Sequence, residues 1–113
     1  MLSIIIPTKE RQQIFAKTLQ AALCAIDQIA AEIIVVNDSL TDEPVIPIDR
    51  RVTLIENSGR GVASARNLGA KHAKGSLLLF LDNDILISSE SVRGMISLHE
   101  QYPNACFNPN WEY

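Results

Sequence analysis

Residues 76–84 read Ser-Leu-Leu-Leu-Phe-Leu-Asp-Asn-Asp, and this stretch decides the fold. Its five apolar residues, 77–81, form a short run of the kind found in strands that are buried on both faces of a parallel sheet. Two carboxylates follow at once, Asp82 and Asp84, with Asn83 between them. Ligands of open α/β sheets bind at the carboxyl ends of the strands. The stretch therefore predicts a parallel sheet with an acidic site at that edge.

Three further segments resemble this strand, and helical patterns lie between them. The strands that we expect are short and rich in Ile, Val or Leu, at 3–7, 32–37, 52–56 and 77–82, with a weaker fifth at 105–108. Apolar residues at three- and four-residue steps predict helices over 11–29, 61–74 and 88–102. The alternation predicts an α/β domain, with a Rossmann-like, mostly parallel sheet and flanking helices.

Local signals mark the ends of two helices and one loop. Gly75 is expected to end the second helix, and Ser88 or Ser89 to cap the third. Segment 38–51 contains two prolines and no helical period, which is typical of a loop, with one helical turn as an open alternative.

Length and composition indicate one small domain. The 113 residues allow one core but not two, and 47% hydrophobic with 20% charged residues is ordinary for a globular protein. We therefore treat 1–113 as a single domain. The net charge of −3 and the scattered Lys and Arg exclude a typical nucleic-acid surface. No apolar run approaches the roughly 20 residues that span a bilayer, and the start lacks the pattern of a signal peptide.

These features predict a cytoplasmic protein, with peripheral attachment at the inner face of the membrane as the alternative. Cys24 and Cys106 are far apart in sequence, so we expect reduced thiols rather than a disulfide. His72 and His99 have no partner at metal-ligand spacing and are expected at the surface. No serine has the Gly-x-Ser-x-Gly context of a serine hydrolase.

Polar clusters follow all four expected strands. They are Pro7-Thr8-Lys9-Glu10-Arg11 after the first strand, Asn37-Asp38-Ser39 with Thr41-Asp42 after the second, Asn57-Ser58-Gly59-Arg60-Gly61 after the third and Asp82-Asn83-Asp84 after the fourth. A parallel sheet brings all four clusters to one edge, which is where doubly wound folds bind ligands. This convergence makes a nucleotide-handling enzyme the leading hypothesis.

The pair Asp82 and Asp84 is the sharpest local signal. Side chains two residues apart in an extended strand point the same way, so the two carboxylates repel unless a cation or hydrogen-bond donors lie between them. Such a pair suits a hard divalent cation that carries a phosphate. The alternative is that Asp82 ends the strand and Asp84 caps a turn.

Segment 57–61 and Arg66 form a second candidate region. Gly59 allows close backbone approach, and the helix that follows offers its N-terminus to a phosphate, although the Gly-Lys-Ser/Thr ending of a P-loop is absent. A tight turn before a helix is the alternative. Arg66 lies one turn into that helix among small apolar residues, which favours a ligand or a carboxylate as its partner over solvent.

With these clusters in this order, the chain resembles the amino-terminal half of the family 2 glycosyltransferases of the GT-A fold. The resemblance covers about residues 3–100, and its segments keep the family's order and spacing: 3–8, 32–38, 41–42, 57–59, 65–69, 73–75 and 79–84.

The resemblance implies a role for each matching residue. Pro7 and Thr8 would lie beside the nucleotide base and ribose, Asp38 would accept a hydrogen bond from the base, and Arg66 would flank the base or diphosphate. Asp82-Asn83-Asp84 would be the DXD-type motif, with Asp82 toward the ribose and the metal and Asp84 toward the metal. Gly59 and Asn83 complete the donor-binding set, and the metal would be Mn²⁺ or Mg²⁺.

The implied reaction is metal-dependent transfer of a sugar from a nucleoside diphosphate, UDP in the leading interpretation, to a hydroxyl of a glycan or lipid-linked acceptor. Members of the family mostly invert the anomeric centre and many serve polysaccharide biosynthesis. No residue of this chain corresponds to the general base, so we expect it to supply the donor-binding half of a larger GT-A domain. An exposed apolar flank of such a partial sheet would favour self-association.

The sequence departs from the family pattern at four positions. Lys9-Glu10 stand where Tyr-Asn is usual, Asn37 replaces a frequent Asp, and Ser39 replaces a frequent Gly. Two other functions stay open at this point. One is a nucleotide-sugar-binding module without catalysis, and the other is a nucleotidyltransferase, which the absence of glycine from segment 7–11 disfavours.

Overall fold

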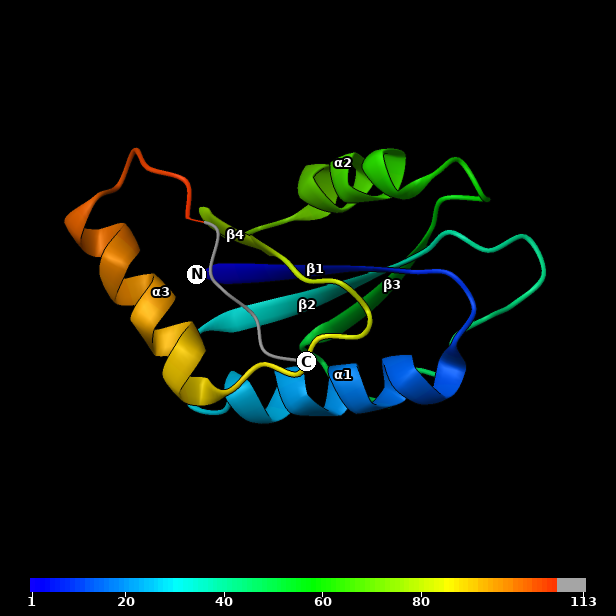
Figure 1. Ribbon diagram of the computed structural model, residues 1–113, viewed down its shortest axis with the longest axis horizontal. Coiled ribbons are helices and arrows are strands. Elements are labelled where there is room, and N and C mark those ends of the chain that lie inside the picture. The colour runs from blue at the N-terminus through cyan, green and yellow to red at the C-terminus, as the bar shows by residue number, and fades with distance from the viewer. Residues whose placement is uncertain (108–113) are drawn as a thin grey trace.

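Four parallel strands form one sheet, as the sequence predicted, and the structure shows their order to be β3-β2-β1-β4. The structure is a computed structural model and describes residues 1–107. The strands are β1 (Leu2–Thr8), β2 (Ala31–Asn37), β3 (Val52–Glu56) and β4 (Leu77–Phe80). The helices are α1 (Gln12–Ala25), α2 (Val62–His72) and α3 (Ser89–Gln101). Figure 1 shows the sheet between its helices, with α2 on one face and α1 on the other.

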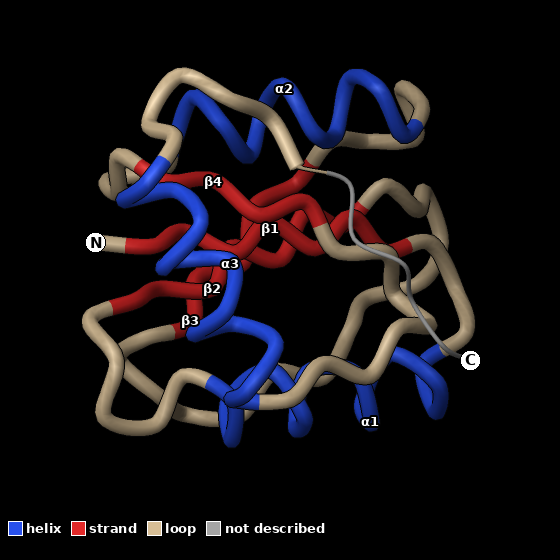
Figure 2. The backbone as a smooth tube through the Cα atoms, turned by 60° about the vertical axis from the view of Figure 1, so that its left-hand side comes forward, coloured by secondary structure: helices blue, strands red, loops and turns tan. Residues whose placement is uncertain are grey.

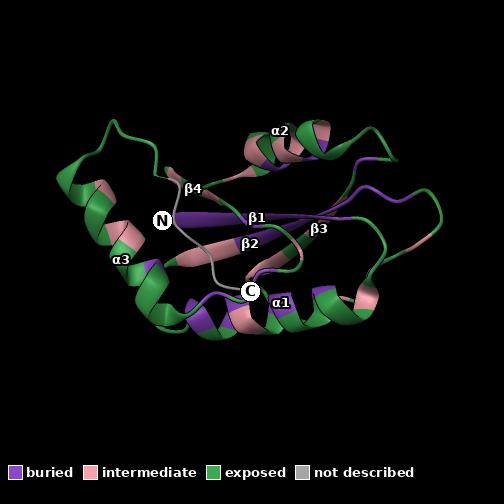
Figure 3. Ribbon diagram, viewed as in Figure 1, coloured by how far each residue is buried: buried purple, intermediate pink, exposed green. Residues whose placement is uncertain are grey.

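The alternation of side chains along β1 and β2 builds two separate apolar layers. Ile4, Ile6 and Val35 face α1 and α3 and belong to the larger core, together with Phe15 of α1. Their neighbours in sequence, Ile5, Ile34 and Val36, face α2 and form a smaller cluster with Ala65 of that helix. Both faces of the two central strands are thus buried, which explains their continuous apolar sequences (Figure 3).

Helix α2 lies unusually close to the sheet because it carries a glycine at the contact. A Cβ atom at Gly69 would overlap the side chain of Ile5 and approach that of Val36. Gly75 has a similar packing role. The prediction that Gly75 ends the helix is wrong. Helix α2 ends at His72, and a Cβ at Gly75 would overlap the backbone oxygen of Met1.

The element boundaries differ from the sequence prediction in several places. β4 ends at Phe80 rather than at residue 82, although the N–H of Leu81 still donates to the carbonyl of Ile5 at 2.9 Å. α1 ends at Ala25 rather than at residue 29, because Gln28 adopts a left-handed conformation (φ 65°) that a helix cannot continue. Ser88 caps α3 as predicted, with its hydroxyl accepting from the N–H of Ser91 at 3.1 Å.

The end of the chain differs as well. Residues 105–107 form no strand, so the fifth predicted strand is wrong over the part that the structure describes, and its residue 108 lies outside that part. Segment 38–51 is a loop without a helical turn. Near its end, hydrogen bonds from Arg51 hold the pKa of Asp49 at about 2, below its ordinary value.

Other surface features follow from the described coordinates. Cys24 and Cys106 are both free and exposed. His72 is exposed as predicted, whereas His99 is half-buried. None of the helices formed by residues 1–107 has both the length and the apolar composition needed to cross a bilayer.

Candidate functional site

The carboxyl edge of the sheet opens into a polar cleft of about 470 Å³. Its lining comes from the ends of β1 and β2, the start of α2 and the segment after β4: Pro7, Thr8, Lys9, Arg11, Asp38, Gly61, Val62, Asp82, Asn83 and Asp84. The parallel register explains why these residues converge. The last pair of β1 with β2 is Thr8 with Asn37, and the last pair of β1 with β4 is Ile5 with Phe80, three residues earlier along β1. The segments that follow all three strands therefore begin at the same edge of the sheet. Figure 2 shows the four strands running side by side toward this edge.

Most of the site residues predicted from the sequence lie in this lining. Two do not: Gly59 and Arg66 are outside it. Gly59 belongs to a left-handed turn with Ser58 (φ 71° and 55°), and a Cβ on it would crowd the side chain of Leu40. Glycine at position 59 is therefore explained by the conformation of the turn and by its close contact with Leu40. Arg66 does not line the cleft, but its guanidinium contacts the carboxylate of Asp82, which does.

Asp38 is buried beneath the cleft, with only 5% of its surface exposed. Its carboxylate accepts from the backbone N–H of Gly61 at 3.2 and 3.1 Å and from Asn57 Nδ2 at 2.7 Å. The acceptor position at the start of α2 also matches the preference of helix N-termini for negative charge. Asp38 thus joins β2, the turn after β3 and α2 into one rigid corner.

Asp82 and Asp84 each face an arginine. Arg66 Nη2 lies 3.1 Å from Asp82 Oδ1, and Arg11 Nη1 lies 3.9 Å from Asp84 Oδ2. All four side chains are substantially exposed, so each pair is screened and weak. Both carboxylates therefore stay accessible to a stronger partner.

Asn83 is fixed from two sides. Its side-chain amide donates to Thr8 Oγ1 at 3.3 Å, and its backbone carbonyl accepts from the buried hydroxyl of Thr18 at 2.7 Å. These bonds tie the segment after β4 to the end of β1 and to α1. The Asp-Asn-Asp segment is consequently held by its middle residue, while the two acidic side chains are left for the cleft.

Lys9 and Arg11 were not assigned to the site from the sequence. Charged residues directly after a strand usually lie in solvent, and only their place beside Thr8 indicated otherwise. Glu10 and Arg11 both have left-handed backbone conformations, with φ 59° and 58°. Non-glycine residues adopt such angles uncommonly, and the strain of about 1–3 kcal/mol each persists where the surrounding structure imposes it.

The two departures at Asn37 and Ser39 have a structural explanation. Asn37 is 3% exposed, and its amide donates to the carbonyl of Asp42 and to Glu56 Oε2 at 2.9 and 3.0 Å. Its Oδ1 accepts from the N–H of Ser39, whose hydroxyl in turn accepts from the backbone of the following turn. An amide at position 37 suits the carboxylate of Glu56, to which an Asp could not donate.

The donor set of the cleft decides which cation it fits. Carboxylate oxygens are ligands for hard cations such as Mg²⁺, which is often bound by one or two carboxylates together with substrate phosphates. Within residues 1–107, no three His, Cys, Asp or Glu side chains gather into a group that could hold a metal. Asp82 and Asp84 therefore do not form a closed metal site by themselves, and two carboxylates supply only part of the ligands that such a cation requires.

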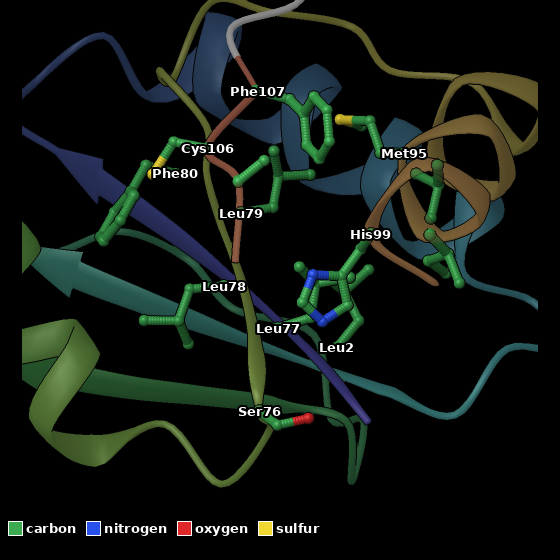
Figure 4. A pocket seen from close by; sticks show the side chains of 13 residues that line it. Leu2, Ser76, Leu77, Leu78, Leu79, Phe80, Met95, His99, Cys106 and Phe107 are labelled. Carbon is green, nitrogen blue, oxygen red and sulfur yellow. The ribbon is translucent and has the colours of Figure 1, made fainter. Parts of the chain in front are cut away.

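A second cavity, of about 500 Å³, lies at the outer edge of β4 and is chemically different. Its walls are β4, α3 and residues 105–107, and Figure 4 shows Leu77, Leu79, Met95 and Phe107 around it. His99 lies in this apolar lining, which accounts for its partial burial. The described residues that line it include no carboxylate, and its lining is mostly apolar, unlike that of the cleft at the carboxyl edge.

Comparison with known proteins places this site in a family. The model of the family described as glycosyl transferase family 2 matches residues 3–113, and the chain belongs to that family. A Haemophilus influenzae protein named only as a glycosyltransferase is 34% identical over 110 residues, which are 95% of this chain and 37% of that relative. The validoxylamine A glucosyltransferase of Streptomyces hygroscopicus subsp. jinggangensis is 32% identical, over 88% of this chain and 25% of its own length.

Solved structures confirm the fold. The crystal structure of Staphylococcus aureus TarS matches 96% of the chain and 23% of its own, with a TM-score of 0.73 and 21% identity. The complex of TarS residues 1–349 with UDP-GlcNAc matches with a TM-score of 0.69 and 18% identity, over 37% of its chain. The fold is thus that of the GT-A glycosyltransferases. The chain spans between 23% and 37% of the length of these matched proteins.

Proposed function

We propose that this chain binds the donor in a glycosyltransferase that moves a sugar from a UDP-sugar to a hydroxyl of a glycan or lipid-linked acceptor, in polysaccharide biosynthesis. The observation that carries the proposal is the meeting of Asp38 with Asp82 and Asp84 at one cleft, from two segments that are far apart in the sequence. Family membership and the UDP-GlcNAc bound by TarS support the choice of donor.

In this proposal each side chain of the cleft binds a different part of the donor. Pro7 and Thr8 border the base and ribose, and Asp38 accepts from the base, its carboxylate held in place by Asn57 and Gly61. Asp82 receives the ribose and the cation, with Asn83 holding the segment in position. Arg66 orients Asp82 through their ion pair.

The phosphates and the cation belong to the other end of the cleft. Asp84, with Asp82, would hold Mn²⁺ or Mg²⁺, and such an ion supplies neutralisation of the charge on the leaving diphosphate. We propose transfer with inversion, in which the acceptor hydroxyl attacks the face of the sugar opposite the diphosphate. We assign no general base within this chain, and the donor-binding role is therefore the part of the reaction that we ascribe to it.

Isothermal titration calorimetry of the whole chain with UDP, GDP and ADP tests this function. We expect UDP to bind in the presence of Mn²⁺, more weakly with EDTA, and at least about tenfold more tightly than the purine nucleotides, if Asp38 accepts from the N–H of a uracil in a position that the larger purine rings do not match. Equal, weak binding of all three nucleotides, or none, would reject the donor-binding role.

We further propose that two copies of the chain associate through β4. This strand has one neighbour, β1, so its outer edge has no strand partner among residues 1–107. Leu78 and Phe80 are 37% and 44% exposed beside it, and exposed apolar edge strands pair readily with one another. Sedimentation velocity should show a dimer that Leu78→Lys abolishes; a monomer at high concentration would reject this.

The free cysteines support a proposal for where in the cell the protein acts. Free, exposed Cys24 and Cys106 suit the reducing cytoplasm, and we propose that the protein acts there, or peripherally at the inner face of the membrane.

A further inference from the structure

We propose that Arg11 binds the diphosphate of the donor and that Asp84 holds this guanidinium in the cleft until the donor arrives. The inference rests on the proposed function and adds to it a residue that neither the sequence motifs nor the family resemblance assigned. Arg11 lines the cleft from the start of α1, and its Nη1 lies 3.9 Å from Asp84 Oδ2.

The contact with Asp84 is weak enough to be exchanged. The Arg11 and Asp84 side chains are 61% and 40% exposed, and an exposed ion pair at this separation adds little stability. A guanidinium matches phosphate oxygens with paired hydrogen bonds, which makes a diphosphate a better partner than one distant carboxylate. A cation taken up by Asp84 would release Arg11 at the place where the phosphates lie.

The charge of the cleft requires a positive group at this position. Two cations, Lys9 and Arg11, face the three carboxylates of Asp38, Asp82 and Asp84. Arg66, which pairs with Asp82, brings the cations beside these carboxylates to three, so the site has no net positive charge to offer a diphosphate that enters without a metal ion. Lys9 and Arg11 are the only basic side chains of that lining, and both come from the loop after β1.

The backbone at Arg11 sets the point at which its side chain leaves the chain. Glu10 and Arg11 are consecutive left-handed residues, and the carbonyl of Arg11 accepts the first helical hydrogen bond of α1, from the N–H of Phe15 at 2.9 Å. The side chain therefore leaves the chain where the strand has ended and the helix has just begun. This conformation places the guanidinium over the cleft, beside Asp84.

The test compares nucleotide binding by Arg11→Gln and by a matched control, Arg93→Gln, which removes an exposed arginine of α3. With Mn²⁺ present, R11Q should weaken UDP about tenfold, as for the loss of a charge-assisted hydrogen bond in a partly screened site, and change uridine less than about twofold. R93Q should change neither. Arg11→Lys should recover part of the affinity for UDP, because it restores the charge without the paired geometry.

A second readout needs no nucleotide. Electron paramagnetic resonance of free Mn²⁺ should show that R11Q binds the ion as well as the wild type or up to about fivefold more tightly, because a competing cation has left Asp84. The inference is overturned if R11Q binds UDP like R93Q, if UDP and uridine weaken equally, or if R11Q loses Mn²⁺. Absence of UDP binding by the wild type would reject the proposed function, and this inference with it, whereas wild-type binding with an unaffected R11Q rejects this inference alone.

Discussion

The carboxylate of Asp38 accepts the backbone N–H of Gly61 through both of its oxygens, at 3.2 and 3.1 Å. This one relationship links the end of β2 to the start of α2. It also explains why a residue that the family resemblance assigns to the nucleotide base is nearly buried. The geometry of the cleft and the folding of α2 onto the sheet therefore depend on the same side chain.

Replacing Asp38 should cost stability as well as affinity. Asp38→Ala leaves Gly61 N–H and Asn57 Nδ2 without their acceptor in a buried place, and we expect a loss of about 1–3 kcal/mol in the free energy of unfolding. Asp38→Asn keeps one acceptor oxygen and should lose less. Urea unfolding measures both. An unchanged midpoint for D38A would mean that the carboxylate is not needed to hold α2.

Asp84 should behave in the opposite way. Its side chain is 40% exposed and its partner Arg11 is 3.9 Å away, so Asp84→Ala should change the unfolding free energy by less than about 0.5 kcal/mol. The rise in melting temperature caused by UDP should lose its Mn²⁺-dependent part in this variant. Asp27→Asn, which removes an exposed carboxylate just beyond α1, is the control and should keep the whole shift. A Mn²⁺-dependent shift that survives in D84A would exclude the metal role.

The sheet and its polar edge could be predicted because their signals are local. Four short apolar runs, with helical periods in the first and third of the gaps between them, predict parallel strands, and parallel strands bring their ends together. β4 ends at Phe80 because the chain leaves the sheet after Leu81, where the sequence had left open that Asp82 and Asp84 belong to a turn. The left-handed conformations of Glu10 and Arg11 were hidden, since no glycine announces them. Lys9 and Arg11 were expected at this edge of the sheet with the rest of their cluster, but no role in the site was predicted for them.

Two glycines in helices provide a matched test of how closely α2 packs. A Cβ at Gly69 would overlap Ile5, so Gly69→Ala should cost about 1–3 kcal/mol through overpacking. Gly94 of α3 has nothing within 4 Å of the same position, so Gly94→Ala should gain about 0.5–1 kcal/mol from helix propensity. Thermal and urea unfolding should give opposite signs. A gain in both variants would show that α2 lies farther from β1.

The departure from the family pattern at Asn37 gives a prediction about a pair of residues. Asn37→Asp removes the donor to the carbonyl of Asp42 and sets a carboxylate beside that of Glu56, now 3.0 Å from Asn37 Nδ2. We expect a loss of about 1–3 kcal/mol, because position 37 is 3% exposed and an unpaired acceptor there is costly. Glu56→Gln alone should cost less, since Glu56 is exposed and an amide oxygen can still accept.

The double variant N37D/E56Q should be more stable than the sum of the single changes predicts, because the amide introduced at position 56 can donate to the carboxylate introduced at position 37. We expect a favourable coupling of about 0.5–2 kcal/mol in a double-mutant cycle measured by urea unfolding. Thr53→Ser, an exposed change on the same strand, replaces Glu56→Gln in the control cycle and should show no coupling. Strict additivity of N37D and E56Q would mean that the departure at Asn37 is independent of Glu56.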